Sequence, residues 1–336
     1  MSDKSLEENQ KPIIGISIGD INGIGPEVIL KTLSDQRITK QLTPVIYASG
    51  GLISFYRKQL DLQNFNYNQI NNIEDIQTKK INVLNIWNER IEIVPGTPSM
   101  EAGKYARLSL ESAVSDLKQQ KIQALVTSPI SKEHTQSEEF NFPGHTEYLA
   151  NAFEAEDSLM LMVHEELRVA VATGHIPLAD VKTALTPEVI ESKLSMLIHS
   201  LQKDFKIKKP RIGILGLNPH AGENGLLGDD ENTVIVPVLE QFREKGNLIF
   251  GPFPADGFFG SNQYMQFDGI LAMYHDQGLI PFKHISQGAG VNFTAGLPGK
   301  RTSPAHGTAF NLAGKNLADP ESFRNALFLA VDLVRP

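Results

Sequence analysis

Three histidines each follow an apolar, strand-like run and have Gly or Pro close by. His175 follows VAVATG, His220 follows GILGLNP and His275 follows ILAMY. Because open α/β sheets gather polar groups at the carboxyl ends of their strands, the three imidazoles could converge on one point. Three neutral imidazoles suit a catalytic divalent metal such as Zn²⁺, which polarises a substrate oxygen. Taken singly, each is equally well explained as a hydrogen-bonded loop histidine, because their spacing matches no local metal motif such as HExxH.

A second group of side chains could bind an anion. The segment FPGHTEYLA places His145 and Thr146 at the start of a helical run. The N-terminus of a helix attracts phosphate or carboxylate, because its backbone N–H groups point outward and its dipole favours negative charge. The alternative is ordinary capping of the helix by Thr146, with Glu147 in the first turn.

Lys283, Asn292 and Arg301 lie in residues 282–315, a Gly- and Pro-rich stretch with little helix or strand pattern. Stretches of this kind are often functional. The Lys and the Arg could clamp an anionic substrate, while the Asn fixes a hydroxyl or a carboxylate. Solvated surface charge is the alternative explanation for the two cations.

Several common catalytic motifs are absent. No segment matches the dinucleotide fingerprint GxGxxG or the phosphate loop GxxxxGK[ST]. The glycine-rich GDINGIGPE at residues 19–27 could bind an anion, but it fits none of these patterns. A standard Rossmann nucleotide site and a P-loop are therefore not supported.

The elements that must position these groups alternate between strand-like and helical segments along the chain. The expected strands are 12–19, 43–49, 81–87, 123–130, 211–217, 247–253 and 269–274, with a hairpin over 158–176. The expected helices are 26–33, 101–120, 231–245 and 320–334, with two more beginning near 144 and 186. This pattern predicts an α/β fold, and 336 residues suggest two domains with a cleft between them.

Composition excludes several classes of protein. The formal net charge of -8 argues against nucleic acid as the main partner. The absence of cysteine excludes disulfides and thiolate ligands, and it fits a reducing compartment. The first eleven residues are polar, and no apolar run approaches the roughly 18 residues of a membrane span. We therefore expect a cytoplasmic protein without membrane contact.

Eight segments, in chain order between about residues 13 and 315, resemble the 4-hydroxythreonine-4-phosphate dehydrogenase family of pyridoxal phosphate (vitamin B6) biosynthesis. They are GISIGDINGIGPEV, LVTSPISKE, FPGHTEYLA, VATGHIPLADV, GLNPHAGENGLLGDDE, GPFPADGFF, YHDQGLIPFK and GVNFTAGLPGKRTSPAHGTAFNLAGK. The resemblance implies the fold of the isocitrate and isopropylmalate dehydrogenases, which bind NAD without the Rossmann fingerprint. It also implies a homodimer.

The resemblance assigns roles to eight side chains that are all present. It implies a divalent metal, Zn, Mg or Co, bound across the dimer interface by His175, His220 and His275. It implies binding of a small phosphorylated substrate by His145, Thr146, Lys283, Asn292 and Arg301. We accordingly expect a discontinuous first domain, 1–130 plus 300–336, and a second domain, 131–299, with most of these ligands and the dimer interface.

The segment HGTAFNLAGK is similar to HGSAPDIAGK of those relatives, which holds the adenosine half of the cofactor. The similarity places His306, Gly307 and Asn311 near NAD, with NADP as a second possibility. Asn311 stands where the relatives have Asp, which weakens the expected bond to the ribose hydroxyls.

The implied reaction is NAD-dependent oxidation of 4-phosphohydroxy-L-threonine at C3 to 2-amino-3-oxo-4-phosphooxybutanoate, which decarboxylates to 3-amino-2-oxopropyl phosphate. Asp276 and Lys283 are candidates for the general base by their position alone. Close relatives that oxidise phosphorylated threonate or erythronate are the first alternative. A non-catalytic metal- or nucleotide-binding protein is the second, and the intact set of eight side chains speaks against it.

Overall fold

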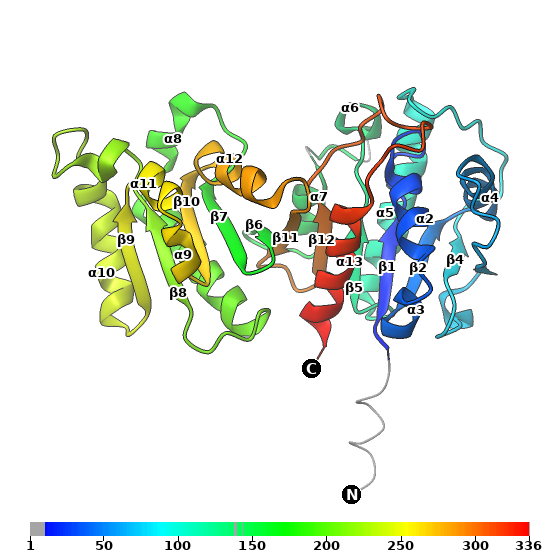
Figure 1. Ribbon diagram of the computed structural model, residues 1–336, viewed down its shortest axis with the longest axis horizontal. Helices are drawn as coiled ribbons and strands as arrows, with labels where there is room; N and C mark the ends of the chain where they lie inside the picture. The colour runs from blue at the N-terminus through cyan, green and yellow to red at the C-terminus, as the bar shows by residue number, and fades with distance from the viewer. Residues whose placement is uncertain (1–10, 138–139, 143, 336) are drawn as a thin grey trace, which may run out of the picture. The chain divides into compact units, whose positions relative to one another are not determined.

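The computed structural model describes residues 11–137, 140–142 and 144–335 (Figure 1). Strands and helices alternate along most of the chain, which confirms the α/β fold class. No helix in these described parts is both long enough and apolar enough to cross a membrane.

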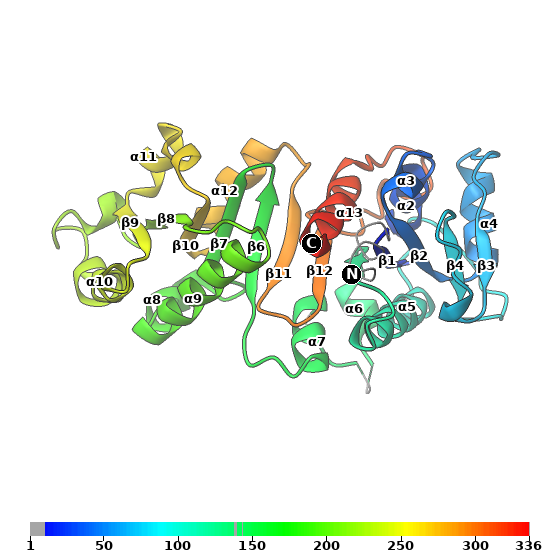
Figure 2. The same ribbon diagram turned by 90° about the horizontal axis from the view of Figure 1, so that it is seen from below.

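The chain divides into two compact units. Unit 1 comprises residues 1–155 and 297–336, and unit 2 comprises residues 156–296. In each unit, helices pack on both faces of the strands (Figure 2).

The sequence predicted a division into 1–130 with 300–336 and 131–299, which has the same discontinuous arrangement. In the structure, the first segment of unit 1 ends 25 residues later than predicted (155 minus 130). The difference comes from packing. Phe140 and Leu149 lie in one buried cluster with side chains from the core of unit 1, so residues 140 to 153 belong to that unit.

Unit 1 is built on parallel strands in the order β3-β4-β2-β1-β5-β12. The strands are β1 (Ile13–Ser17), β2 (Thr43–Ala48), β3 (Asn68–Ile70), β4 (Asn82–Asn85), β5 (Ala124–Thr127) and β12 (Lys300–Pro304). The helices are α2 (Gly25–Leu33), α3 (Ile38–Gln41), α4 (Gly50–Gln59), η1 (Ile73–Asp75), α5 (Met100–Lys118), α6 (Lys132–Thr135), α7 (His145–Ala152) and α13 (Glu321–Val334). Figure 2 shows α5 on one face and α2 with α13 on the other. Covered on both faces, β2 and β5 are buried at every residue, as their continuous apolar character requires.

Unit 2 mixes both strand directions, in the order β11-β6-β7-β10-β8-β9. The strands are β6 (Leu159–His164), β7 (Leu167–Thr173), β8 (Arg211–Leu215), β9 (Leu248–Phe253), β10 (Gly269–Tyr274) and β11 (Val291–Ala295). The helices are α8 (Leu178–Ala184), α9 (Pro187–Lys203), η2 (Pro219–Gly222), η3 (Glu231–Ile235), α10 (Val236–Glu244), α11 (Ala255–Gly260), η4 (Gln263–Gln266) and α12 (His275–Ser286). The antiparallel pairing of β6 with β7 confirms the predicted hairpin, while β7, β10, β8 and β9 run parallel. Helices α9 and α12 both contact β7 and β10, from opposite faces.

The expectation of little regular structure in residues 282–315 is wrong. Lys283 lies in the last turn of α12, Asn292 on β11 and Arg301 on β12. Pro281 inside α12 hides the helical pattern, since proline is usually a helix breaker. The two strands are each five residues long and separated by glycines, so they resemble a loop in sequence.

Candidate active site

Two of the three histidines from the predicted metal site meet at the carboxyl ends of β7 and β10. These strands are parallel neighbours in which Thr173 pairs with Tyr274, so His175 and His275 leave the sheet side by side. The Thr173 hydroxyl ties the two ends together by donating to the Met273 carbonyl at 2.7 Å. The two imidazole rings lie 5.5 Å apart between centroids, with 45° between their planes.

The His275 ring is oriented by its neighbour. Its Nδ1 lies 2.7 Å from Oδ1 of Asp276 at the start of α12. A carboxylate at Nδ1 fixes the proton there and leaves the Nε2 lone pair for a metal, the arrangement that most metal-binding histidines have. The assignment of the proton to Nδ1 follows from this partner.

A glutamine next to this pair, Gln277, had no role assigned from sequence. The Oε1 atom of Gln277 accepts a hydrogen bond from the Met273 N–H at 2.7 Å, and its Nε2 donates to the Gly216 carbonyl at 2.5 Å. Gln277 therefore ties the end of β10 to the end of β8, from which the His220 loop starts. Its place directly after His275 and Asp276 was the signal available in the sequence.

His220 does not join the other two histidines within the chain. Its backbone is left-handed (φ 54°), and its Nδ1 lies 3.2 Å from Oε2 of Glu223. The loop is anchored by Glu231, which is 2 % exposed and accepts from the Asn218 N–H at 2.7 Å. Over the described ranges, no three His, Asp or Glu side chains form a group that could hold a metal ion.

Arg301 forms the centre of a buried polar cluster in unit 1. It is 3 % exposed, and its Nε and Nη2 donate to the hydroxyl of Thr127 at 2.9 and 2.6 Å. The parallel pairing of β12 with β5 makes this contact, because it sets Arg301 beside the last residues of β5. Burial lowers the pKa of the guanidinium to about 10, and the nearby carboxylate of Glu147 opposes that shift.

His145 begins α7 in the same cluster. Its Nε2 is buried, and none of the described residues hydrogen-bonds to it. Burial holds the pKa of His145 well below its ordinary value of 6.5, and the positive charges of Arg301 and Lys132 lower it further. The N-cap is Gly144, which offers no side-chain acceptor, so the alternative of capping by Thr146 is not found.

The remaining predicted substrate residues lie in unit 2. Lys283 is exposed in the last turn of α12, and Asn292 is half-buried on β11. The Oδ1 atom of Asn292 is buried, and no hydrogen bond to it is found within the described residues. The structure therefore places the predicted anion-binding residues in both units.

The predicted cofactor segment is an irregular turn after β12, held against the loop between β1 and α2. The Ile24 N–H donates to the Thr308 carbonyl at 3.0 Å. His306 Nδ1 lies 3.0 Å from the Gly307 carbonyl, while its Nε2 is buried with no hydrogen-bond partner among the described residues. Gly307 faces open space, since nothing lies within 4 Å of where a Cβ would be. Asn311 is exposed.

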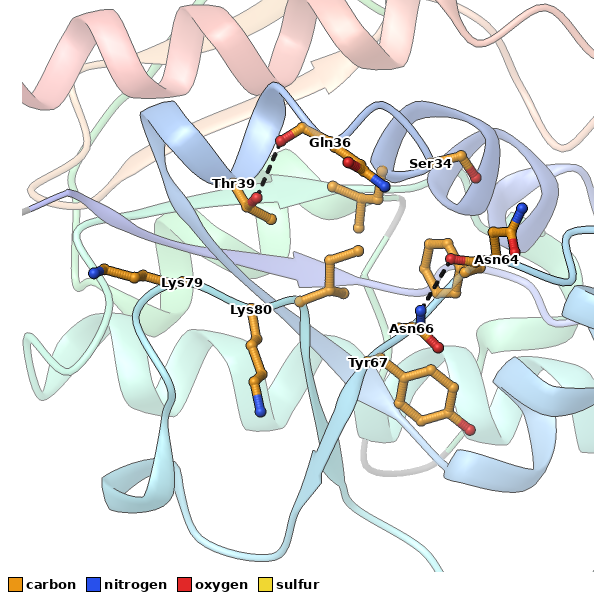
Figure 3. A pocket seen from close by; sticks show the side chains of 11 residues that line it. Ser34, Gln36, Thr39, Asn64, Asn66, Tyr67, Lys79 and Lys80 are labelled. Atoms are coloured by element: carbon orange, nitrogen blue, oxygen red, sulfur yellow. Dashed lines mark hydrogen bonds between the residues drawn. The ribbon is translucent and has the colours of Figure 1, made fainter.

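A cavity of about 300 Å³ in unit 1 lies away from all of these residues (Figure 3). Its wall includes residues that precede β3 and β4, so it lies near the amino ends of the parallel strands. Figure 3 shows Gln36 and Thr39 on one side and Lys80 and Tyr67 on the other. None of the predicted site residues lines this cavity.

Comparison with known proteins covers nearly the whole chain. The family model of "Pyridoxal phosphate biosynthetic protein PdxA" matches residues 40–330. The chain is 47% identical to the 4-hydroxythreonine-4-phosphate dehydrogenase of Bacteroides thetaiotaomicron, over 98% of this chain and 90% of that protein.

Two further comparisons bear on fold and substrate. A crystal structure of a 4-hydroxythreonine-4-phosphate dehydrogenase from Burkholderia phymatum superposes with a TM-score of 0.82 at 34% identity, over 97% of this chain and 99% of that one. A provisionally named D-threonate 4-phosphate dehydrogenase from Oceanobacillus iheyensis is 37% identical, over 97% of this chain and 98% of that protein.

Proposed function

The chain belongs to the family of pyridoxal phosphate biosynthetic protein PdxA and is a dehydrogenase, and we propose that it oxidises 4-phosphohydroxy-L-threonine at C3 with NAD. The product would be 2-amino-3-oxo-4-phosphooxybutanoate, which loses CO₂ to give 3-amino-2-oxopropyl phosphate. The observation that carries the proposal is the cluster of His145 and Arg301, because it suits the phosphate of such a substrate. The names of the relatives supply the rest of the substrate.

The anion cluster suits a phosphate for a physical reason. Arg301 is held by Thr127 through Nε and Nη2, so its guanidinium is fixed before any ligand arrives. His145 is kept neutral and can donate one hydrogen bond from its ring. A fixed donor set loses little freedom on binding, which favours affinity. Thr146, Lys283 and Asn292 would complete the contacts to the substrate.

A divalent metal fits part of the donor set. His175 and His275 offer two neighbouring imidazoles, and Asp276 orients one of them as metal-binding histidines require. When bound, Zn²⁺ or a similar ion lowers the pKa of a substrate hydroxyl and stabilises negative charge on its oxygen. His220 lies outside this pair, so the proposed site needs a second copy of the chain to complete it. This is why we propose a homodimer with shared metal sites.

The cofactor segment offers groups that suit NAD or NADP. His306 Nε2 is a buried polar atom without a partner among the described residues, and the open space at Gly307 lets a ligand approach the backbone. Asn311 is exposed and would contact the adenosine half. We keep NAD as the first choice on the resemblance alone.

The chain itself supplies positioning and proton transfer. Asp276 is a positioning residue, because its carboxylate hydrogen-bonds to the His275 imidazole. Lys283 is exposed and can contact the anionic substrate or take the hydroxyl proton.

A cytoplasmic location stays a prediction from the cysteine-free sequence.

The deciding experiment compares two substrates. We would follow NADH formation from 4-phosphohydroxy-L-threonine and from phosphorylated threonate, before and after removing metal with a chelator and restoring it. Faster, metal-dependent turnover of the first substrate supports the proposal. Silence with both substrates would contradict it and favour a binding protein.

The second candidate is oxidation of phosphorylated threonate or erythronate. It is favoured by the similarity to the D-threonate 4-phosphate dehydrogenase. His145 and Arg301 suit the phosphate of either substrate, so they do not separate the two. Faster turnover of threonate phosphate in the same assay would select this candidate.

A further inference from the structure

Lys132 lies beside the anion cluster but has no role so far. It is the first residue of α6, the short helix that follows β5. Ser131 caps this helix, and its hydroxyl also lies 2.8 Å from Nδ1 of His134. The helix packs against α5, where the absence of a side chain at Gly103 leaves room for the His134 carbonyl. The backbone that carries Lys132 is therefore fixed by its neighbours.

The side chain of Lys132 reaches the start of α7. Its Cε lies 3.7 Å from the position that a Cβ would have on Gly144, and Oε2 of Glu147 lies 3.3 Å from the same point. The lysine charge is close enough to His145 to lower the pKa of that imidazole. Lys132 thus lies on the side of α7 that carries the predicted phosphate ligands.

The local charges favour an anion. Lys132 and Arg301 are positive, Glu147 is negative and His145 is held neutral, so the cluster has a net charge of about one positive unit. The N-terminus of α7 adds its dipole and N–H groups that no side chain caps. Lys132 is exposed, and none of the described residues forms an ion pair or hydrogen bond with its amine. Its ammonium group is available for a ligand.

We propose that Lys132 is a further ligand of the substrate phosphate, acting beside His145 and Arg301. The proposal rests on the proposed function only in taking a phosphorylated substrate. The ammonium group would neutralise part of the phosphate charge and donate a charge-assisted hydrogen bond. A surface lysine that only meets water is the competing explanation.

Inorganic phosphate is the probe that separates this proposal from the proposed function. We would measure its binding by calorimetry to the wild type, Lys132→Met, Lys132→Arg and the matched control Lys58→Met, an exposed lysine on α4. We expect Lys132→Met to bind roughly tenfold or more weakly, the scale of a hydrogen bond to a charged group. The Arg variant should restore most of the affinity, and the control should match the wild type. Equal affinity of Lys132→Met and the wild type would overturn the proposal.

A second measurement does not depend on turnover. In Lys132→Met the pKa of His145, followed by NMR with His145→Gln to assign the signal, should rise because a nearby positive charge is gone. Added phosphate should raise the pKa of His145 by more in the wild type than in Lys132→Met. An unchanged His145 pKa in a folded Lys132→Met protein would also overturn the proposal. If phosphate binding responds as expected but neither phosphorylated substrate is oxidised, the proposed function fails and Lys132 remains an anion ligand.

Discussion

Two histidines of this chain, one in each unit, have opposite surroundings. His275 has a carboxylate 2.7 Å from its Nδ1, and a second imidazole beside it. His145 is half-buried with its Nε2 atom buried, and it has two cations near it. The carboxylate prepares an imidazole to bind a cation, whereas the cations and burial keep an imidazole neutral next to an anion. The neighbours, more than the residue type, decide which ligand each histidine suits.

The largest expected effect comes from removing the His275 imidazole in unit 2. His275→Ala removes the imidazole that Asp276 orients, so metal should be lost and turnover should fall by about a thousandfold or more. Metal analysis of the purified protein and NADH formation would measure both. His199→Ala, an exposed histidine on α9, is the matched control. Full metal content in His275→Ala would exclude the ligand role.

The next effect tests the carboxylate itself. Asp276→Asn keeps the shape of the side chain but removes its charge, so metal affinity should fall about 10- to 100-fold, as for other partners of metal-binding histidines. Competition with a chelator would measure the affinity. Asp256→Asn, at the equivalent first-turn position of α11, should leave it unchanged. An unaltered affinity in Asp276→Asn would mean that the carboxylate does not tune His275.

A smaller effect is expected at Lys283. Lys283→Ala should raise the KM for the phosphorylated substrate about tenfold, with little change in the KM for NAD, because one charged contact is lost. Lys203→Ala, in the last turn of α9, is the control. A fall in kcat with unchanged KM would instead assign Lys283 to proton transfer.

The smallest effect concerns stability against pH. The pKa of His145 in the folded protein lies below 6.5, so the unfolded chain binds its proton first as pH falls. The neutral form of His145 therefore makes its full contribution to the free energy of unfolding above pH 6.5. That contribution is lost as pH falls from 6.5 through the lowered pKa of His145 in the folded protein. His145→Gln should show a smaller fall in Tm between about pH 7.5 and 5.5 than the wild type. Parallel curves for the two proteins would contradict the neutral state of His145.

The sequence predicted where the strands end better than it predicted which strand ends lie side by side. Each histidine was expected just after a strand, and His175 and His275 are found there. Their contact depends on β10 pairing with β7 across 100 residues (275 minus 175), and no local pattern encodes that pairing. His220 was expected to converge with them, but its loop takes a left-handed turn that a hydrogen bond between Asn218 and Glu231 anchors. The spacing of residues in the sequence does not predict such a turn.

The predicted anion-binding residues were identified by residue type, but their secondary structure was not predicted. Lys283, Asn292 and Arg301 were expected in a loop, yet they occupy a helix and two strands, because short elements between glycines lack a clear period. The bond between Arg301 and Thr127 joins residues 174 positions apart. It follows from β12 pairing with β5, which becomes apparent only in three dimensions.

The discontinuity of unit 1 has a consequence for synthesis on the ribosome. Unit 2 is one continuous stretch, 156–296, so it can fold as soon as it has emerged. Unit 1 must wait for β12 and α13, and until then β5 has an unpaired edge where β12 will bind. Arg301 arrives with that last strand, so a truncated translation product would hold the folded unit that carries His175 and His275 without Arg301.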